Sequence, residues 1–211
     1  VTCRRRPEVS AQYISHRGDM AVERENSLAA VKRAHACGVV GCEIDVRVRK
    51  DGVLALGHDR LRPGAATFEE VVRYMAENGM FPLLDVKEPA ATKPAIDILR
   101  KYGLLEKTMT IVYTAEEAKR HKALDSAISP FILSHRKKGE TDDDYLARYE
   151  RMFAESGVDG AFLSTGNRHL AERFHAKGYR VMFGSFTRQG ADRPFAKVGD
   201  FVIVDDPSFA R

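Results

Sequence analysis

Short apolar segments rich in β-branched residues alternate with longer amphipathic segments along the whole of this 211-residue chain. The apolar segments have the length and composition of buried strands, and most of the intervening segments have the apolar period of helices. Such alternation predicts a parallel sheet, because crossover helices carry the chain back between successive strands. The predicted strands are Gln12–Ser15, Cys42–Val48, Pro82–Lys87, Thr108–Tyr113, Pro130–Ser134, Gly160–Ser164, Arg180–Gly184 and Phe201–Val204.

Eight strands connected in this way fit a closed (β/α)8 TIM barrel. The competing architecture is an open doubly wound sheet. That fold commonly carries a GxGxxG turn after its first strand, and Ser15-His16-Arg17-Gly18 does not match this pattern. We therefore expect an α/β protein with a single-domain TIM barrel over residues 11–211, preceded by an N-terminal extension of residues 1–10.

Helices are predicted in the gaps between the strands. We expect Asn26 to cap a helix over Leu28–Ala36 that stops at Gly38. Thr67 and Glu70 have the spacing of a capping box at the start of the next helix. The other predicted helices are Lys93–Tyr102, Ala115–Leu124, Thr141–Ser156 and Asn167–Lys177, with room for a short one within Thr187–Val198.

Composition restricts the class of partner. Lys and Arg number 34 against 30 Asp and Glu, and the basic residues are spread out, so we expect no nucleic-acid partner. No apolar run approaches the ~20 residues that a membrane span needs, so no stable span is expected. Three cysteines do not suggest a disulfide framework, and reduced thiols favour a cytoplasmic location. Because the chain begins with Val1, a removed N-terminal signal is the alternative. The sequence does not predict an oligomeric state.

Ionisable side chains alternate along the second and third predicted strands. Side chains two residues apart share a face, so Glu43 and Asp45 point the same way, as do Asp85 and Lys87. Charges inside a barrel are costly unless they are paired or hold a cation. Three carboxylates against one lysine suit one divalent cation, and oxygen ligands favour Mg²⁺ or Ca²⁺. An inner salt-bridge network, or strands with their two faces exchanged, are the alternatives.

Two histidines are expected at the end of the barrel where such enzymes place their chemistry. His16 ends the first strand, and His58 follows the short apolar segment Val53–Leu56. Cleavage of a phosphodiester needs charge neutralisation on the phosphate oxygens, a base for the nucleophile and an acid for the leaving alkoxide. A cation, Arg17, Lys87 and the two histidines together supply these groups. A metal-dependent phosphodiesterase is therefore predicted.

Five short motifs follow one another between residues 16 and 59. They are His16-Arg17-Gly18, Glu25-Asn26-Ser27, Glu43-Ile44-Asp45-Val46, Lys50-Asp51-Gly52 and His58-Asp59. Their order and spacing closely resemble those of the glycerophosphodiester phosphodiesterase family, and Asp85-Val86-Lys87 resembles that family's acidic-x-Lys strand. The resemblance is dense from His16 to Lys87 and thin from there to the last strand.

The resemblance implies a TIM barrel that hydrolyses glycerophosphodiesters to an alcohol and glycerol 3-phosphate with a divalent cation. It also implies a role for each matched residue. His16 and His58 become the catalytic acid/base pair. Arg17 and Lys87 become the phosphate-binding residues. Glu43, Asp45 and Asp85 become the metal ligands.

Three departures from the family pattern bear on the substrate. Asp85 stands where members usually have Glu, although the more distantly similar sphingomyelinase D family has Asp there. Only Arg60–Ala66 lies where members usually insert a small domain, so this compact form should have a more open mouth. Members usually offer a Trp on the seventh strand, and this chain has none. We expect one of three residues to line the substrate pocket in place of this Trp: Phe183, Ser185 or Phe186.

The main prediction is a hydrolase of small-molecule glycerophosphodiesters that uses histidine acid/base catalysis. An open, apolar mouth would favour a phospholipase D-like enzyme that acts on lysophospholipid or sphingolipid head groups through a cyclic phosphate. A third candidate is a non-catalytic barrel that binds phosphoesters. The presence of both histidines, the lysine and all three acidic residues argues against it.

Overall fold

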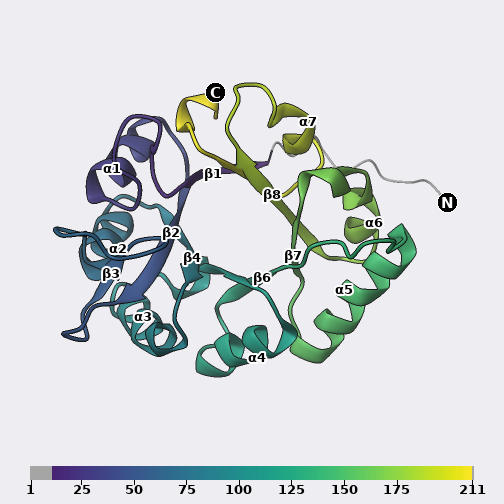
Figure 1. The fold of residues 1–211 in the computed structure, drawn as a ribbon, viewed down its shortest axis with the longest axis horizontal. Coiled ribbons are helices and arrows are strands. Elements are labelled where there is room, and N and C mark those ends of the chain that lie inside the picture. The colour runs from purple at the N-terminus through teal and green to yellow at the C-terminus, as the bar shows by residue number, and fades with distance from the viewer. Residues whose placement is uncertain (1–10, 211) are drawn as a thin grey trace.

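The computed structural model describes residues 11–210, in which the predicted strands form a closed parallel barrel surrounded by helices (Figure 1). Each barrel strand pairs with the next, and β1 closes the ring by pairing with both β2 and β9. The predicted (β/α)8 TIM barrel is confirmed. The predicted N-terminal extension, residues 1–10, lies outside the described residues. The eight barrel strands are β1 (Gln12–His16), β2 (Gly41–Val48), β4 (Phe81–Val86), β5 (Met109–Val112), β6 (Ser129–Leu133), β7 (Gly160–Leu163), β8 (Arg180–Phe186) and β9 (Phe201–Val204).

The helices lie between the strands in sequence and cover the outside of the barrel (Figure 1). They are α1 (Leu28–Ala36), α2 (Phe68–Glu77), α3 (Pro89–Lys101), α4 (Ala115–Leu124), α5 (Asp142–Ser156), α6 (Ala171–Ala176) and α7 (Arg193–Ala196), with 3-10 turns at Leu105–Lys107, Thr165–Leu170 and Pro207–Phe209. Within residues 11–210, none of these helices has the length and apolar character that a bilayer span requires.

One predicted helix cap is correct and one is wrong. Thr67 caps α2 by accepting a hydrogen bond from the Glu70 backbone, 3.2 Å away, as predicted. Ser27, not Asn26, caps α1, and its hydroxyl accepts from the Ala30 backbone. An N-cap residue is normally extended, whereas Asn26 has a left-handed backbone with φ 56°. Two other predicted helices also differ. The helix expected over Lys93–Tyr102 begins earlier, at Pro89, and that expected over Asn167–Lys177 divides into a 3-10 turn and α6.

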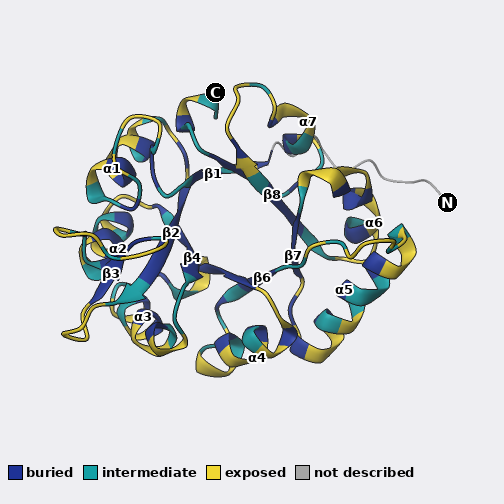
Figure 2. Ribbon diagram, viewed as in Figure 1, coloured by how far each residue is buried: buried dark blue, intermediate teal, exposed yellow. Residues whose placement is uncertain are grey.

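Apolar side chains form one layer inside the barrel and further layers between the sheet and the helices. Figure 2 shows the resulting pattern of buried strands inside helices whose outer faces are exposed. The outer layers include Ile44, Val46 and Leu84, so the charged residues that alternate with them face inward. The alternative with exchanged faces is therefore wrong. The buried inner layer consists of Ile14, Leu83, Met109, Ile111, Phe131, Phe162, Met182 and Ile203.

The barrel strand β2 differs from its neighbours because none of its residues belongs to this buried inner layer. Its inward positions are Gly41, Glu43 and Asp45, and a side chain at Gly41 would collide with the ring of Phe81. Beyond the barrel, β2 pairs antiparallel with the short strand β3 (Leu54–Leu56). This hairpin projects at the side of the barrel (Figure 1) and leads directly to His58.

Candidate active site

Three carboxylates converge inside the barrel on β2 and β4. Asp45 and Asp85 are direct partners across the two strands, and Glu43 lies two residues before Asp45. All three side chains are buried. One carboxylate oxygen from each lies within 4.8 Å of the other two. The structure therefore brings together the three residues predicted to bind a metal.

This cluster carries an excess of negative charge. Burial raises the pKa of Glu43 well above its usual value, and the nearby charges of Asp45 and Asp85 raise it further. Lys87 lies between the two aspartates, with its Nζ 2.8 Å from Asp45 Oδ1 and 2.5 Å from Asp85 Oδ2. Asp45 Oδ1 is fully buried, and its contact with Lys87 lacks the alignment of a hydrogen bond. When all three carboxylates are ionised, Lys87 and Arg17 together balance two of the three negative charges.

Arg17 reaches the carboxylates from the loop that follows β1. Its Nε lies 3.1 Å from Asp45 Oδ2, and its backbone N–H donates to Glu43 Oε2 over 3.1 Å. Its Nη1 donates to Glu25 Oε2 over 2.8 Å. Both residues predicted to bind phosphate, Arg17 and Lys87, thus lie against the acidic cluster.

Asn26 holds Asp45 in place by two hydrogen bonds. The Asn26 Nδ2 donates to Asp45 Oδ2 over 2.7 Å, and its Oδ1 accepts from the Asp45 backbone over 3.0 Å. The left-handed backbone of Asn26 turns its side chain toward β2, and Asn adopts this conformation more readily than most residues. The sequence analysis missed this role because Asn is also a common helix cap. The available signal was its place in the motif Glu25-Asn26-Ser27.

His16 is oriented by a carboxylate from the last strand of the barrel. Its Nδ1 lies 2.7 Å from Asp205 Oδ1, while its Nε2 lies 3.9 Å from Glu43 Oε2. An ionised carboxylate can only accept, so Nδ1 carries the proton and Nε2 is left on the side of Glu43. Asp205 was also missed. The pairing of β1 with β9 places it next to His16, because Ser15 and Val204 are direct partners.

His58 is held beside β2 by the backbone of the β2–β3 hairpin. Gly57 donates its N–H to the Asp45 carbonyl over 3.1 Å. Arg47 holds the same segment, with its Nε and Nη2 donating to the His58 carbonyl over 2.9 and 2.7 Å. The His58 Nδ1 lies 2.7 Å from Asp59 Oδ1. Arg47 is a third positioning residue that the sequence analysis did not identify.

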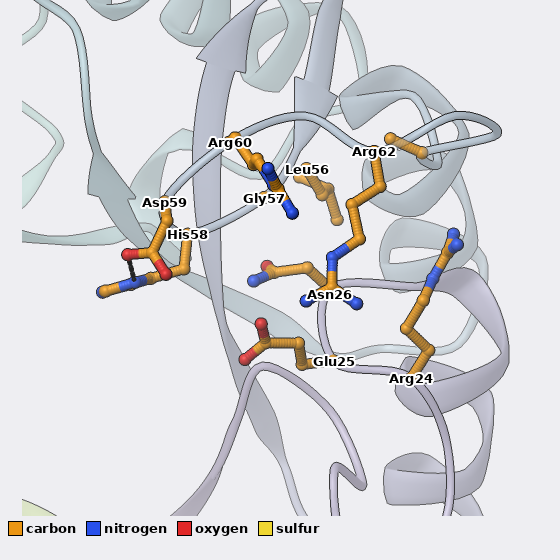
Figure 3. A pocket seen from close by; sticks show the side chains of 10 residues that line it. Arg24, Glu25, Asn26, Leu56, Gly57, His58, Asp59, Arg60 and Arg62 are labelled. Atoms are coloured by element: carbon orange, nitrogen blue, oxygen red, sulfur yellow. Dashed lines mark hydrogen bonds and ion pairs between the residues drawn. The ribbon is translucent and has the colours of Figure 1, made fainter.

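A pocket beside His58 lies next to the carboxylate cluster, although none of the three carboxylates lines it. It has a volume of about 340 Å³ and is lined by His58, Glu25 and Asn26, among others (Figure 3). Glu25 contacts Arg17 and Asn26 contacts Asp45, so the pocket wall adjoins the residues of the cluster. His58 itself is about one-third exposed, whereas the carboxylates are buried.

Of the three residues expected to line the pocket at the seventh barrel strand, the structure excludes two. Phe183 and Phe186 are buried in the layer that faces the helices, where both pack against the ring of Phe195. Only Ser185 of the three candidates is exposed.

An aromatic residue from another strand contacts the acidic cluster. Tyr113, which follows β5, donates its hydroxyl to Asp85 Oδ2 over 3.1 Å. The aromatic side chain that contacts the acidic cluster therefore comes from a different strand.

Comparison with known proteins places the matching segment around this site. Residues 16–79 match the sequence model of the glycerophosphoryl diester phosphodiesterase family. A segment of 46 residues is 50% identical to a glycerophosphodiester phosphodiesterase of Caldanaerobacter subterraneus subsp. tengcongensis. This match covers 22% of the chain and 19% of that relative.

Solved structures of similar fold cover nearly the whole chain. The glycerophosphodiester phosphodiesterase of Agrobacterium tumefaciens superposes with a TM-score of 0.77 at 16% identity, over 94% of this chain and 98% of that one. A phosphodiesterase of Oleispira antarctica, solved in complex with the product sn-glycerol-3-phosphate, gives 0.75 at 18% identity, over 93% and 94% of the two chains. At these identities the likeness establishes the fold.

Proposed function

We propose that this chain is a glycerophosphodiester phosphodiesterase that hydrolyses glycerophosphodiesters to an alcohol and glycerol 3-phosphate. The match of residues 16–79 to that family's sequence model supports the proposal. The observation that carries the proposal is the buried group Glu43, Asp45 and Asp85 with the Nε2 of His16 beside it. The product bound to the Oleispira antarctica phosphodiesterase is of the same chemical class.

We propose that Glu43, Asp45 and Asp85 hold one divalent cation. The residues fit such an ion, because three buried carboxylates face two cationic side chains and Asp45 Oδ1 lacks an aligned hydrogen bond. The donors are all oxygens, and Cys42 lies in the outward layer, so Mg²⁺ or Ca²⁺ is favoured over softer metals. When bound, the cation supplies positive charge that stabilises the phosphate oxygens during cleavage.

His16 and His58 form the proposed acid/base pair. In both rings Nδ1 donates to a carboxylate, Asp205 or Asp59, which leaves Nε2 available for proton transfer. One histidine, in its neutral form, takes the proton from the attacking water at Nε2. The other, protonated on both ring nitrogens, gives its Nε2 proton to the leaving alkoxide. Asp205 and Arg47 act through these histidines as positioning residues.

Arg17 and Lys87 are proposed to bind the non-bridging phosphate oxygens. Both side chains are largely buried and already face the carboxylates, so their positive charges act in a region of low dielectric. Their contacts with Asp45 fix their positions before substrate arrives.

The proposal is tested by assaying purified protein with glycerophosphoglycerol, glycerophosphoinositol, glycerophosphocholine and a lysophospholipid. Each is incubated with Mg²⁺, Ca²⁺ or EDTA, and products are identified by phosphorus NMR. We expect glycerol 3-phosphate to form with a divalent cation and not with EDTA. A cyclic phosphate from the lysophospholipid would instead support the phospholipase D-like alternative. Absence of turnover with every substrate and cation would contradict the proposed activity.

A further inference from the structure

The pocket beside His58 has a basic wall that the reaction described above does not use. Arg24, Arg60 and Arg62 line it together with Glu25 and Asp59. Figure 3 shows the side chains of Arg60 and Arg62 extending from the loop after His58 toward the region of Asn26 and Glu25. This loop is the short connection between β3 and α2.

The acidic residues of the pocket are already paired. Glu25 binds Arg17, and Asp59 binds His58. Arg24 donates to the Gly64 carbonyl over 3.1 Å.

By contrast, the guanidinium groups of Arg60 and Arg62 make no hydrogen bond or ion pair with any residue between 11 and 210. The pocket lining therefore carries three arginines against two carboxylates, and two of the three guanidinium groups have no partner among residues 11–210.

The position of this wall determines which part of a substrate would meet it. His58 lines the pocket, and Asn26 lines it while also contacting Asp45. A phosphodiester placed between His58 and the carboxylate cluster would therefore direct one of its two ester groups into the pocket. A guanidinium group binds phosphate oxygens in a planar, bidentate manner.

We propose that Arg60 and Arg62 bind a phosphate monoester on the alcohol portion of the substrate, so that the preferred substrates are glycerophosphodiesters of phosphorylated alcohols. This inference rests on the proposed hydrolase function. It disfavours choline head groups, since a quaternary ammonium would meet positive charge in a pocket whose lining includes no Phe, Tyr or Trp.

The test compares two substrates that differ by a single phosphate, glycerophosphoinositol and glycerophosphoinositol 4-phosphate, at fixed free Mg²⁺. We expect kcat/KM to be roughly tenfold higher or more for the phosphorylated substrate, the effect of a charged hydrogen-bonding contact. In the double variant Arg60→Gln/Arg62→Gln, the ratio of the two kcat/KM values should fall to about one, and each single variant should give an intermediate ratio.

Arg73→Gln is the matched control, because Arg73 is an exposed residue of α2 outside the pocket lining. It should keep the ratio of the unmodified protein. Equal kcat/KM values for the two substrates in the unmodified protein, or a ratio that survives the double variant, would overturn the inference and leave the proposed hydrolase function standing. Failure to cleave either substrate while glycerophosphoglycerol is cleaved would overturn the inference alone, whereas failure with all three would overturn both.

Discussion

The two ends of the barrel interior are filled in opposite ways. At the amino-terminal end, aromatic rings pack edge to face, with Phe131 and Phe81 both against Phe201. Toward the carboxyl ends of β2 and β4, the inward-facing positions are instead occupied by Asp45 and Asp85. The apolar end stabilises the fold, whereas the acidic end places like charges together where we propose that a cation and a phosphate bind. The difference shows that stability and chemistry are separated by position along the strands.

The largest effect should come from truncating the apolar end. Phe131 is fully buried in the inner layer, so Phe131→Ala is expected to cost about 3–5 kcal/mol of unfolding free energy. Urea denaturation measures this loss. Turnover per folded molecule should stay within about twofold, because the ring is outside the acidic cluster. A loss below about 1 kcal/mol would mean that this end does not carry the stability assigned to it.

Removal of a histidine at the other end should have the opposite result, a large loss of activity with little loss of stability. His16→Ala and His58→Ala are each expected to lower kcat by roughly 10² or more, from loss of acid/base catalysis. Asp205→Asn should have a smaller effect, about tenfold, because His16 is kept and only its orientation is perturbed. Steady-state kinetics with unfolding curves as controls separate the two profiles. Full activity in His16→Ala would remove that residue from the mechanism.

Replacement of one proposed metal ligand should raise the cation concentration that activity requires. Asp85→Asn keeps the shape of the side chain and removes its charge, so the half-saturating Mg²⁺ concentration should rise roughly 10- to 100-fold. Activity titrated against Mg²⁺ gives this value. Asp97→Asn on the exposed surface of α3 is a matched control and should leave it unchanged. An unaltered requirement in Asp85→Asn would exclude Asp85 as a ligand.

The smallest effect concerns the folding stability that the protein loses by burying the acidic end. Because the pKa of Glu43 is raised in the folded protein, the folded state keeps this proton to higher pH than the unfolded chain does. Stability of the cation-free protein should therefore decrease as pH rises above the usual Glu pKa. Glu43→Gln should weaken this decrease and add about 1 kcal/mol at neutral pH, measured in EDTA. A variant that is less stable than the unmodified protein at pH 8 would contradict this sign.

Sequence patterns predicted the barrel and its acidic cluster because both depend on local rules. A period of two fixed which side chains of β2 and β4 share a face, and the cost of buried charge predicted either a bound ion or a salt-bridge network there. The same period, applied to β8, would have placed Phe183 outward next to inward Met182. The shift in register between Phe183 and Phe186 was not predictable in this way.

The positioning residues depend on long-range register, which sequence patterns do not fix. Asp205 meets His16 across 189 positions of the chain only because β9 pairs with β1 at one particular offset. Asn26 and Arg47 likewise depend on the path of a loop and a hairpin rather than on any periodic signal. Helix caps are ambiguous for a related reason, since neighbouring Asn26 and Ser27 are both good capping residues.

Crystals soaked in Mn²⁺ give the most direct test of the proposed centre, because an anomalous difference map locates the ion independently of activity. We predict one peak enclosed by Glu43, Asp45 and Asp85, at roughly 2.0–2.6 Å from an oxygen of each. A peak bound elsewhere, or the absence of any peak among these three carboxylates at saturating Mn²⁺, would contradict the assignment.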